Sequence, residues 1–551
     1  MTVTSVPRAG VPSEERIPVT TAGRGDRWVP PLLAAGLALR LLGIDEPLID
    51  QQAWRQVDTA AMARNFLMEG YDLLRPRIDW RGTSSGVVET NFPLYPYLVA
   101  CLYGVAGGAY EWLARSLAAL FSVLAALPIY ALGRRLSPGP WLARCAAGIY
   151  LALPLSWFFG RAVMPEALMI LLSVTAIWAF QRWLETSSWI DFGYAATVAG
   201  LCFAVKIPTL YLGFPLVAMA LSQHGWRFLQ RPSMWMYLGL VMLPPALWYG
   251  HAASLFDETG LTFGIFGNSG YDKWSHGLLL TAGFWWTMIN RFLFSVLTPV
   301  GSLLAVAGIV GMWPRGQQDR HRWFLYAWLG ALMAYVLLVP EGNRKLHYYQ
   351  LPFVPLASLF AAAPLAALLG EQVAANPLHD VLTRAGRSGR WWVVVALGGV
   401  VAASAHEVAD YRRPPTYGYY KTCHAAGQAL DAKLPLGATV VVGDIDDNWG
   451  TPFRAQSPTL LYYMNRKGWQ ITLNEFDAAH LDSLAALGAD FFVVPGGFVL
   501  DKPAFLDDLL TKGVATAASF PETWHDRTSF LAGANRHTGP ERHVLVVRLG
   551  P

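Results

Sequence analysis

Charged residues are scarce in this sequence. They make up 15% of the 551 residues, whereas a soluble protein carries about 25%. Hydrophobic residues make up 54% of the chain, and the mean hydropathy is +0.32. So little charge combined with so much apolar side chain excludes an ordinary soluble protein and indicates one embedded in a membrane.

Dense basic tracts and patterned cysteines are also missing. The net charge is only +4, so we expect no binding to nucleic acid. The four cysteines are scattered at Cys101, Cys145, Cys202 and Cys423, and they predict neither a disulfide framework nor a metal site. Tryptophan is abundant, at 23 residues, which suits a membrane interface or a sugar-binding surface.

Apolar runs of about 20 residues can cross a bilayer as helices. We predict eleven such spans, near 28–44, 112–133, 141–160, 164–183, 189–205, 207–221, 235–251, 290–313, 323–340, 348–370 and 391–408. A further apolar stretch, 93–105, is too short to span, and we predict that it lies along the membrane surface or re-enters the membrane.

The short basic loops set the predicted orientation. With the N-terminal segment 1–27 in the cytoplasm, nearly all of these loops fall on the cytoplasmic side, as the positive-inside rule requires. This topology predicts a multi-pass protein of the cell (inner) membrane, with a membrane domain over 28–408. The first outer loop, 45–111, and the tail, 409–551, then lie outside the cytoplasm.

The tail differs in composition from the membrane domain. "ATVVVGD", "DFFVVPGG" and "HVLVVRL" are typical of buried strands, while "AAHLDSLAALG" and "AFLDDLLTKG" are typical of helices. Alternation of strands and helices predicts a small α/β domain outside the membrane.

Two carboxylates stand out in the first outer loop, in "DQQAWRQVDTAAMARNF" at residues 50–66. Asp50 and Asp58 flank Arg55 at an expected membrane boundary, where partial burial would raise a carboxylate pKa and produce a general base. If a divalent cation such as Mg²⁺ or Mn²⁺ is bound, the same two residues are its expected ligands. We interpret the other acids as solvated loop charges: Glu69, Asp72 and Asp79.

Further along the loop, Glu89 is predicted to point back at Asp50 and to form a carboxylate pair with it; alternatively it satisfies a helix dipole. In a short outer turn beyond the predicted span 141–160, Arg161 and Glu166 either form a local ion pair or take part in a site. Lys206, between two apolar runs, either reaches for the interface or binds an anionic headgroup.

Basic residues are unexpected on the outer side of the membrane, yet "PEGNRKLHYYQLPFVP" places several of them there. Attraction to anionic lipid is one explanation. Binding of a phosphate group is the other, with these residues as the clamp: Arg344, Lys345, His347 and Tyr348.

These features, in this order along the chain, resemble the GT-C membrane glycosyltransferases, of the kind related to protein O-mannosyltransferases and lipid A aminoarabinose transferases. The resemblance covers roughly residues 28–370. It implies a polytopic helical membrane fold and an enzyme that moves a sugar, with inversion, from a polyprenyl-phosphate carrier to an extracytoplasmic acceptor. That acceptor is a lipid, a polysaccharide or a protein.

The resemblance also implies roles for particular residues. The catalytic acid-base role falls on Asp50 or Asp58, with Glu89 as a second acid, although Asn91 stands where an acid is expected in this branch. Glu166 replaces the usual Asp of the short turn. We expect the substrates to be bound by Arg55, Gln56, Arg64, Arg161, Glu166, Lys206, Arg344, Lys345, His347 and Tyr348.

Two other classes of function remain open from the sequence. A transporter would also carry charges near the membrane, but it would place paired charges near the middle of its spans. A non-catalytic subunit that binds lipid-linked sugar is the second alternative, and loss of transfer on substitution of Asp50 and Asp58 would argue against it.

Overall fold

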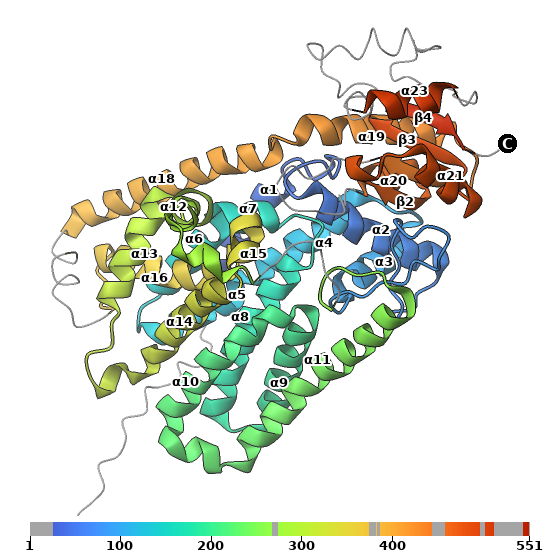
Figure 1. Ribbon diagram of the computed structural model, residues 1–551. Coiled ribbons are helices and arrows are strands. Elements are labelled where there is room, and N and C mark those ends of the chain that lie inside the picture. Colours follow the sequence, from blue (N-terminus) through green and yellow to red (C-terminus); the bar gives the residue numbers. More distant parts are fainter. Residues whose placement is uncertain are drawn as a thin grey trace, which may run out of the picture.

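The computed structural model describes residues 26–266, 274–373, 382, 386–443, 458–495, 502–511 and 544–549. The predicted segment 1–27 lies almost wholly outside these ranges. A large helical part is followed by the long helix α18 (Gly386–Arg412), which leads to a small sheet at the end of the chain (Figure 1).

The helical part before α18 follows the predicted apolar runs. Its α-helices are α1 (Val29–Leu41), α2 (Ala53–Glu69), α3 (Leu94–Ala106), α4 (Glu111–Leu124), α5 (Ala126–Leu136), α6 (Trp141–Ala152), α7 (Pro154–Phe159), α8 (Glu166–Thr186), α9 (Trp189–Val205), α10 (Gly213–His224), α11 (Pro232–Thr259), α12 (Ala282–Asn290), α13 (Pro299–Gly311), α14 (Trp323–Leu338), α15 (Pro340–Lys345) and α16 (Phe353–Leu368).

Three helical stretches of the described chain are long and apolar enough to cross a membrane: Glu111–Leu136, Glu166–Thr186 and Gly389–Arg412. A fourth is added if Ala282–Val296 and Pro299–Gly311, bent by 103°, count as one span. The predicted number of eleven spans therefore stays a prediction.

Proline explains one of the breaks in the predicted spans. The expected span 141–160 is divided where Pro154 starts α7, since proline has no amide hydrogen to continue α6. The expected span 207–221 opens instead with the short 3₁₀ helix η1 (Ile207–Leu212), which comes before α10. The predicted surface element 93–105 is confirmed as a helix, α3, with 13 residues.

The helices pack into one large apolar core. α9 lies between α8 and α11, and these helices run side by side (Figure 1). α16 packs against both α6 and α13, and nearly all of its residues are buried. This packing leaves α2 and α3 at one end of the bundle, near the final sheet (Figure 1).

The predicted α/β fold of the tail is found in the described residues. Four strands form a sheet in the order β2-β1-β3-β4: β1 (Thr439–Gly443), β2 (Lys467–Ile471), β3 (Phe491–Pro495) and β4 (Val544–Arg548). β1 pairs in parallel with both β2 and β3, whereas β4 is antiparallel to β3.

Helices cover this sheet: α19 (Tyr417–Asp431), α20 (Thr459–Met464), α21 (Ala478–Ala486) and α23 (Pro503–Thr511). Three strands and two helices were predicted from the sequence. The strand β2 was not, because "KGWQI" begins with Lys and Gly and lacks a continuous apolar run.

Candidate active site

α2 carries most of the predicted polar residues. It starts after Gln52, whose φ of 62° lies in the left-handed region, and nearly all of its side chains as far as Phe66 are buried. Because α2 is so fully covered, we infer that its packing against the rest of the chain holds it in place. The site is therefore built on a rigid element.

Asp50 is enclosed by polar partners and is 3% exposed. Its Oδ1 accepts a hydrogen bond from Gln56 Nε2 (2.5 Å), and its Oδ2 lies 3.2 Å from Arg115 Nη1 and 3.1 Å from Arg161 Nη2. Gln56 in turn accepts from the amide of Val163 at 3.1 Å. Asp50 thus joins the start of α2 to α4 and to the turn before α8.

Asp58 has a different environment. It is 1% exposed, its Oδ1 accepts a hydrogen bond from Trp80 Nε1 at 2.9 Å, and its Oδ2 has no hydrogen-bond partner. Burial raises the pKa of Asp58 to about 8, against the opposing effects of the Trp80 hydrogen bond and the charge of Arg55. A carboxyl with a pKa near the working pH is suited to general acid–base chemistry.

This pKa predicts how stability depends on pH. The folded state binds a proton on Asp58 that the unfolded state has lost, so this contribution is present in acid and falls as pH rises toward about 8. The free energy of unfolding should fall by about 1.4 kcal/mol per pH unit from this group alone. Asp58→Asn should remove that slope and raise the Tm in alkaline buffer, measured by thermal unfolding in detergent; a higher wild-type Tm there would contradict the assignment.

Lys206 and Glu166 form an ion pair at the ends of α9 and α8. Glu166 is buried and its Oε2 has no hydrogen-bond partner, while Lys206 Nζ lies 4.9 Å from the centre of the Tyr348 ring. The alternative of a local Arg161–Glu166 pair is therefore wrong, because Arg161 binds Asp50 instead.

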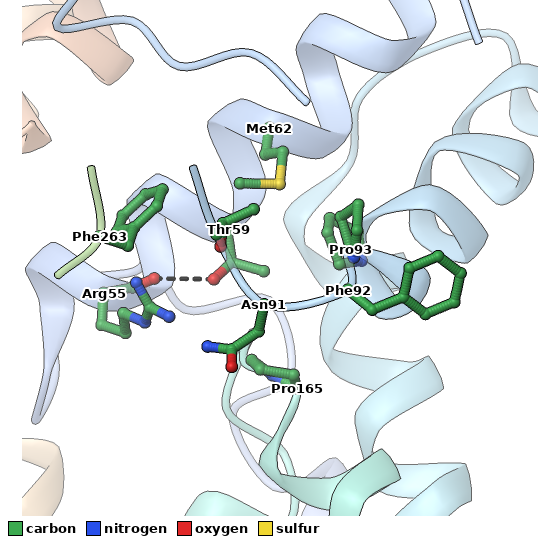
Figure 2. A pocket seen from close by; sticks show the side chains of 10 residues that line it. Arg55, Thr59, Met62, Asn91, Phe92, Pro93, Pro165 and Phe263 are labelled. Carbon is green, nitrogen blue, oxygen red and sulfur yellow. Dashed lines mark hydrogen bonds between the residues drawn. The ribbon is translucent and has the colours of Figure 1, made fainter. Parts of the chain in front are cut away.

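A pocket lies beside α2 (Figure 2). The guanidinium of Arg55 is 4.7 Å from the centre of the Phe263 ring and makes no ion pair within the described part of the chain. Asn91 also lines the pocket, and its Oδ1 accepts a hydrogen bond from Tyr249 at 2.9 Å. The lining residues are Arg55, Thr59, Met62, Thr90, Asn91, Phe92, Pro93, Pro96, Pro165 and Phe263.

Glu89 does not pair with Asp50, and that prediction is wrong. Its carboxylate accepts hydrogen bonds from the Thr262 hydroxyl and, at 3.4 Å, from the amide of Ile265. The backbone of Glu89 also pairs with the segment after α11, which draws its side chain away from Asp50.

The charge of the basic segment after α14, which contains Arg344 and Lys345, is partly neutralised by an acid of the same segment. Arg344 lies 2.6 Å and Lys345 3.5 Å from the carboxylate of Glu341. His347 Nδ1 lies 3.5 Å from Gln51 Nε2, and burial lowers the pKa of this imidazole to about 3, so it is neutral at pH 7. The segment thus lies beside the start of α2, and its phosphate-binding role stays a prediction.

Several important residues were missed or misjudged from the sequence. Asp79 is fully buried, not solvated, and it binds Arg64 at 2.6 Å and Lys467 at 2.5 Å. Arg64 is occupied by this contact and by the carbonyl of Tyr462, so its role in substrate binding stays a prediction. Arg115 was overlooked because it stands inside an apolar run, where a charge buried against Asp50 leaves no motif.

The geometry does not favour a metal at Asp50 and Asp58. Both oxygens of Asp50 are occupied by an amide or by guanidinium groups. Across the described residues, no group of three or more His, Cys, Asp or Glu side chains is placed to hold a metal ion. A divalent cation therefore stays a prediction from the sequence.

Comparison with known proteins identifies the fold. The model of the dolichyl-phosphate-mannose-protein mannosyltransferase family matches residues 90–249, and no curated protein sequence matches the chain. ArnT from Cupriavidus metallidurans in the apo state aligns with a TM-score of 0.61 and 14% identity, over 95% of this chain and 98% of that chain.

Bound to undecaprenyl phosphate, ArnT aligns with a TM-score of 0.59 and 13% identity, over the same shares of both chains. The archaeal oligosaccharyltransferase AglB from Archaeoglobus fulgidus, in complex with an inhibitory peptide and a dolichol-phosphate, aligns with a TM-score of 0.54 and 13% identity, over 87% of this chain and 71% of that chain. The chain has the GT-C fold. The resemblance predicted from the sequence is confirmed, and the part of the chain that matches the family model contains Arg161, Glu166 and Lys206.

Proposed function

We propose that this protein is a membrane glycosyltransferase that moves a sugar from a polyprenyl-phosphate carrier to an acceptor outside the cytoplasm. One observation carries the proposal. Asp58, a buried carboxyl with a raised pKa, lies on the same helix as Arg55, whose guanidinium faces a pocket without an ion-pair partner among the described residues. A base and a free cation are the two groups that such a transfer needs.

The phosphate of the donor would be held chiefly by Arg55, and Lys206, which pairs with Glu166, would assist it. Arg55 acts electrostatically on both Asp58 and Lys206, so the three groups belong to one electrostatic environment. The departing phosphate is already a good leaving group and needs charge neutralisation rather than a proton. Arg344 and Lys345 take a secondary part here, because Glu341 already balances them.

The reaction breaks the bond between the anomeric carbon and the phosphate oxygen, and it forms a bond from that carbon to the acceptor. Asp58 in its ionised form takes the acceptor's proton through Oδ2, which makes no hydrogen bond in the structure. Attack from the face opposite the phosphate inverts the anomeric centre. The acceptor belongs to one of three classes, a lipid, a polysaccharide or a protein.

The proposal is tested by incubating the purified protein with a panel of polyprenyl-phosphate sugars and membrane extracts as acceptors. Release of free polyprenyl phosphate, together with glycosylated product, is the expected result. Binding of the lipid without release under all acceptors would instead favour a non-catalytic subunit. Movement of the intact donor across a vesicle membrane would favour a transporter.

Arg55→Gln should lower kcat/KM for the donor by about 10- to 100-fold, because a hydrogen bond to a charged group contributes about 1.5–3 kcal/mol. Arg75→Gln is the matched control, since Arg75 is exposed and pairs with Glu258 outside the pocket. Equal kinetics for Arg55→Gln and the control would remove Arg55 from the phosphate site.

A further inference from the structure

The final sheet and the first outer loop are joined along one strand. β2 is an edge strand of the sheet, with β1 on one side only. Its free edge is covered by the segment around Trp80, which forms a parallel bridge with Gly468. The amide of Gly82 donates to Gly468 O at 2.7 Å, and the amide of Gly468 donates to Asp79 O at 3.1 Å. Covering an edge strand in this way satisfies its unpaired backbone groups.

Gly82 is required by this close approach, and Gly468 is required by the pairing of β2 with β1. A Cβ on Gly82, whose φ is +58°, would lie 2.6 Å from the indole nitrogen of Trp469. A Cβ on Gly468 would lie 1.8 Å from the carbonyl oxygen of Val440. The contact between the two parts of the chain is therefore specific in its backbone geometry and leaves no space for another side chain.

Charged groups strengthen the same junction. Lys467 Nζ, at the start of β2, contacts Asp79 at 2.5 Å, Glu69 at 3.4 Å and the side chain of Asn65. Arg64 approaches Asp79 from α2. Because Asp79 is fully buried, removing one of its two cations would leave a poorly compensated charge.

The junction ends at the proposed base. Trp80 directly follows Asp79, and its indole donates to Asp58 Oδ1 at 2.9 Å while its ring packs edge-on against Phe263 at 5.7 Å. Phe263 also lines the pocket and lies under Arg55. A shift of β2 would therefore move the indole that fixes Asp58.

We propose that strand β2 positions the catalytic carboxyl, with Lys467 and Trp80 as positioning residues that set the ionisation and orientation of Asp58. The proposal rests on the proposed function for its catalytic consequence only. The physical coupling between the sheet and Asp58 exists whether or not a sugar is transferred.

The electrostatic consequence has a definite sign. Arg55 and Asp79 are the charged groups acting on the Asp58 carboxyl, from α2 and from the segment before Trp80. Loss of the Trp80 hydrogen bond removes a stabiliser of the ionised form, so the pKa of Asp58 should rise. Loss of Lys467 leaves the negative charge of Asp79 less balanced and acts in the same direction.

The test measures the titration of Asp58 without any substrate. The Tm of the wild-type protein and of each variant is compared with the Tm of the same protein carrying Asp58→Asn, across neutral and alkaline pH. Trp80→Phe should raise the pH midpoint of the Asp58 titration by about one unit, which corresponds to the loss of a hydrogen bond to a charged group. Lys467→Met should move it up by about half a unit.

Two controls make the result specific. Lys467→Arg keeps the charge and should restore the wild-type midpoint, and Lys421→Met removes an exposed lysine of the same part of the chain and should change nothing. Lys467→Gln takes the place of Lys467→Met if the latter fails to fold. A shift in Trp80→Phe with none in the Lys467 variants would overturn the role of β2, and no shift in either would overturn the whole coupling.

The catalytic consequence is read separately from the pH profile of transfer. If the protein transfers sugar, the rise of kcat/KM with pH should move by the same amounts in the same variants. Absence of transfer in the wild-type protein would reject the proposed function and leave the Tm titration to decide the coupling. A moved titration with an unmoved pH profile would show that Asp58 is not the base, and it would overturn the catalytic part of this inference.

Discussion

Asp58→Asn should lower sugar transfer by about 10²–10⁴-fold, the range that general base catalysis contributes. Asparagine has the shape of aspartate and can still accept the Trp80 hydrogen bond through its amide oxygen, but it cannot take a proton. Binding of the polyprenyl-phosphate donor should be retained, because Arg55 and Lys206 are untouched. The measurement is initial-rate transfer at saturating donor, with donor affinity measured separately.

Asp72→Asn is the matched control, since Asp72 lies in the same loop but is exposed. In the wild-type protein, transfer should rise with pH toward about 8, as the carboxyl of Asp58 loses its proton. Persistence of near-normal transfer in Asp58→Asn would end the assignment. Loss of donor binding together with transfer would instead indicate a fault in folding or in the pocket.

Much of the fold could be predicted because local sequence patterns indicate it. Apolar runs predicted the helices, and short β-branched or aromatic runs predicted β1, β3 and β4. The division of the expected span 141–160 into α6 and α7 was missed, although Pro154 marks it in the sequence. The strand β2 escaped because its place in the sheet comes from pairing with β1 and with the Trp80 segment rather than from its composition.

The membership of the candidate site stays a prediction, and its connections could not be predicted from the sequence. Asp50 pairs with Arg161 before α8 and Lys206 pairs with Glu166 at the start of α8, whereas Asp58 lies further along α2 and binds Trp80. The ion-pair partners of these residues could not be predicted, because a pair such as Asp50 with Arg115 joins residues 65 positions apart. Which carboxylate meets which cation is decided by tertiary packing, and a single sequence holds no local signal of it.

The surroundings of the two aspartates also separate their roles, which the sequence left open. Asp50 meets two guanidiniums and an amide, so its charge is balanced and both its oxygens are used. Asp58 has one neutral donor and one free oxygen. Of the two, only Asp58 has an oxygen that makes neither a hydrogen bond nor an ion pair.

Asp50→Asn is accordingly expected to act on stability. Loss of the carboxylate leaves Arg115 and Arg161 buried, with only the longer 3.5 Å contact from Arg161 to the half-exposed Glu46 as compensation, which should cost about 3–5 kcal/mol of unfolding free energy. The exposed pair of Arg75 with Glu258 gives the control, because Glu258→Gln should cost no more than about 1 kcal/mol. Thermal and denaturant unfolding in detergent measure both.

A second variant distinguishes charge imbalance from loss of a chemical group. Replacing Asp50 and Arg161 together by Leu and Met removes the carboxylate and one of its two guanidiniums, so part of the lost stability should return. Transfer should recover with stability if Asp50 only holds the site together. An Asp50→Asn protein with normal Tm and no transfer would reverse the assignment and make Asp50, not Asp58, the residue that takes the proton.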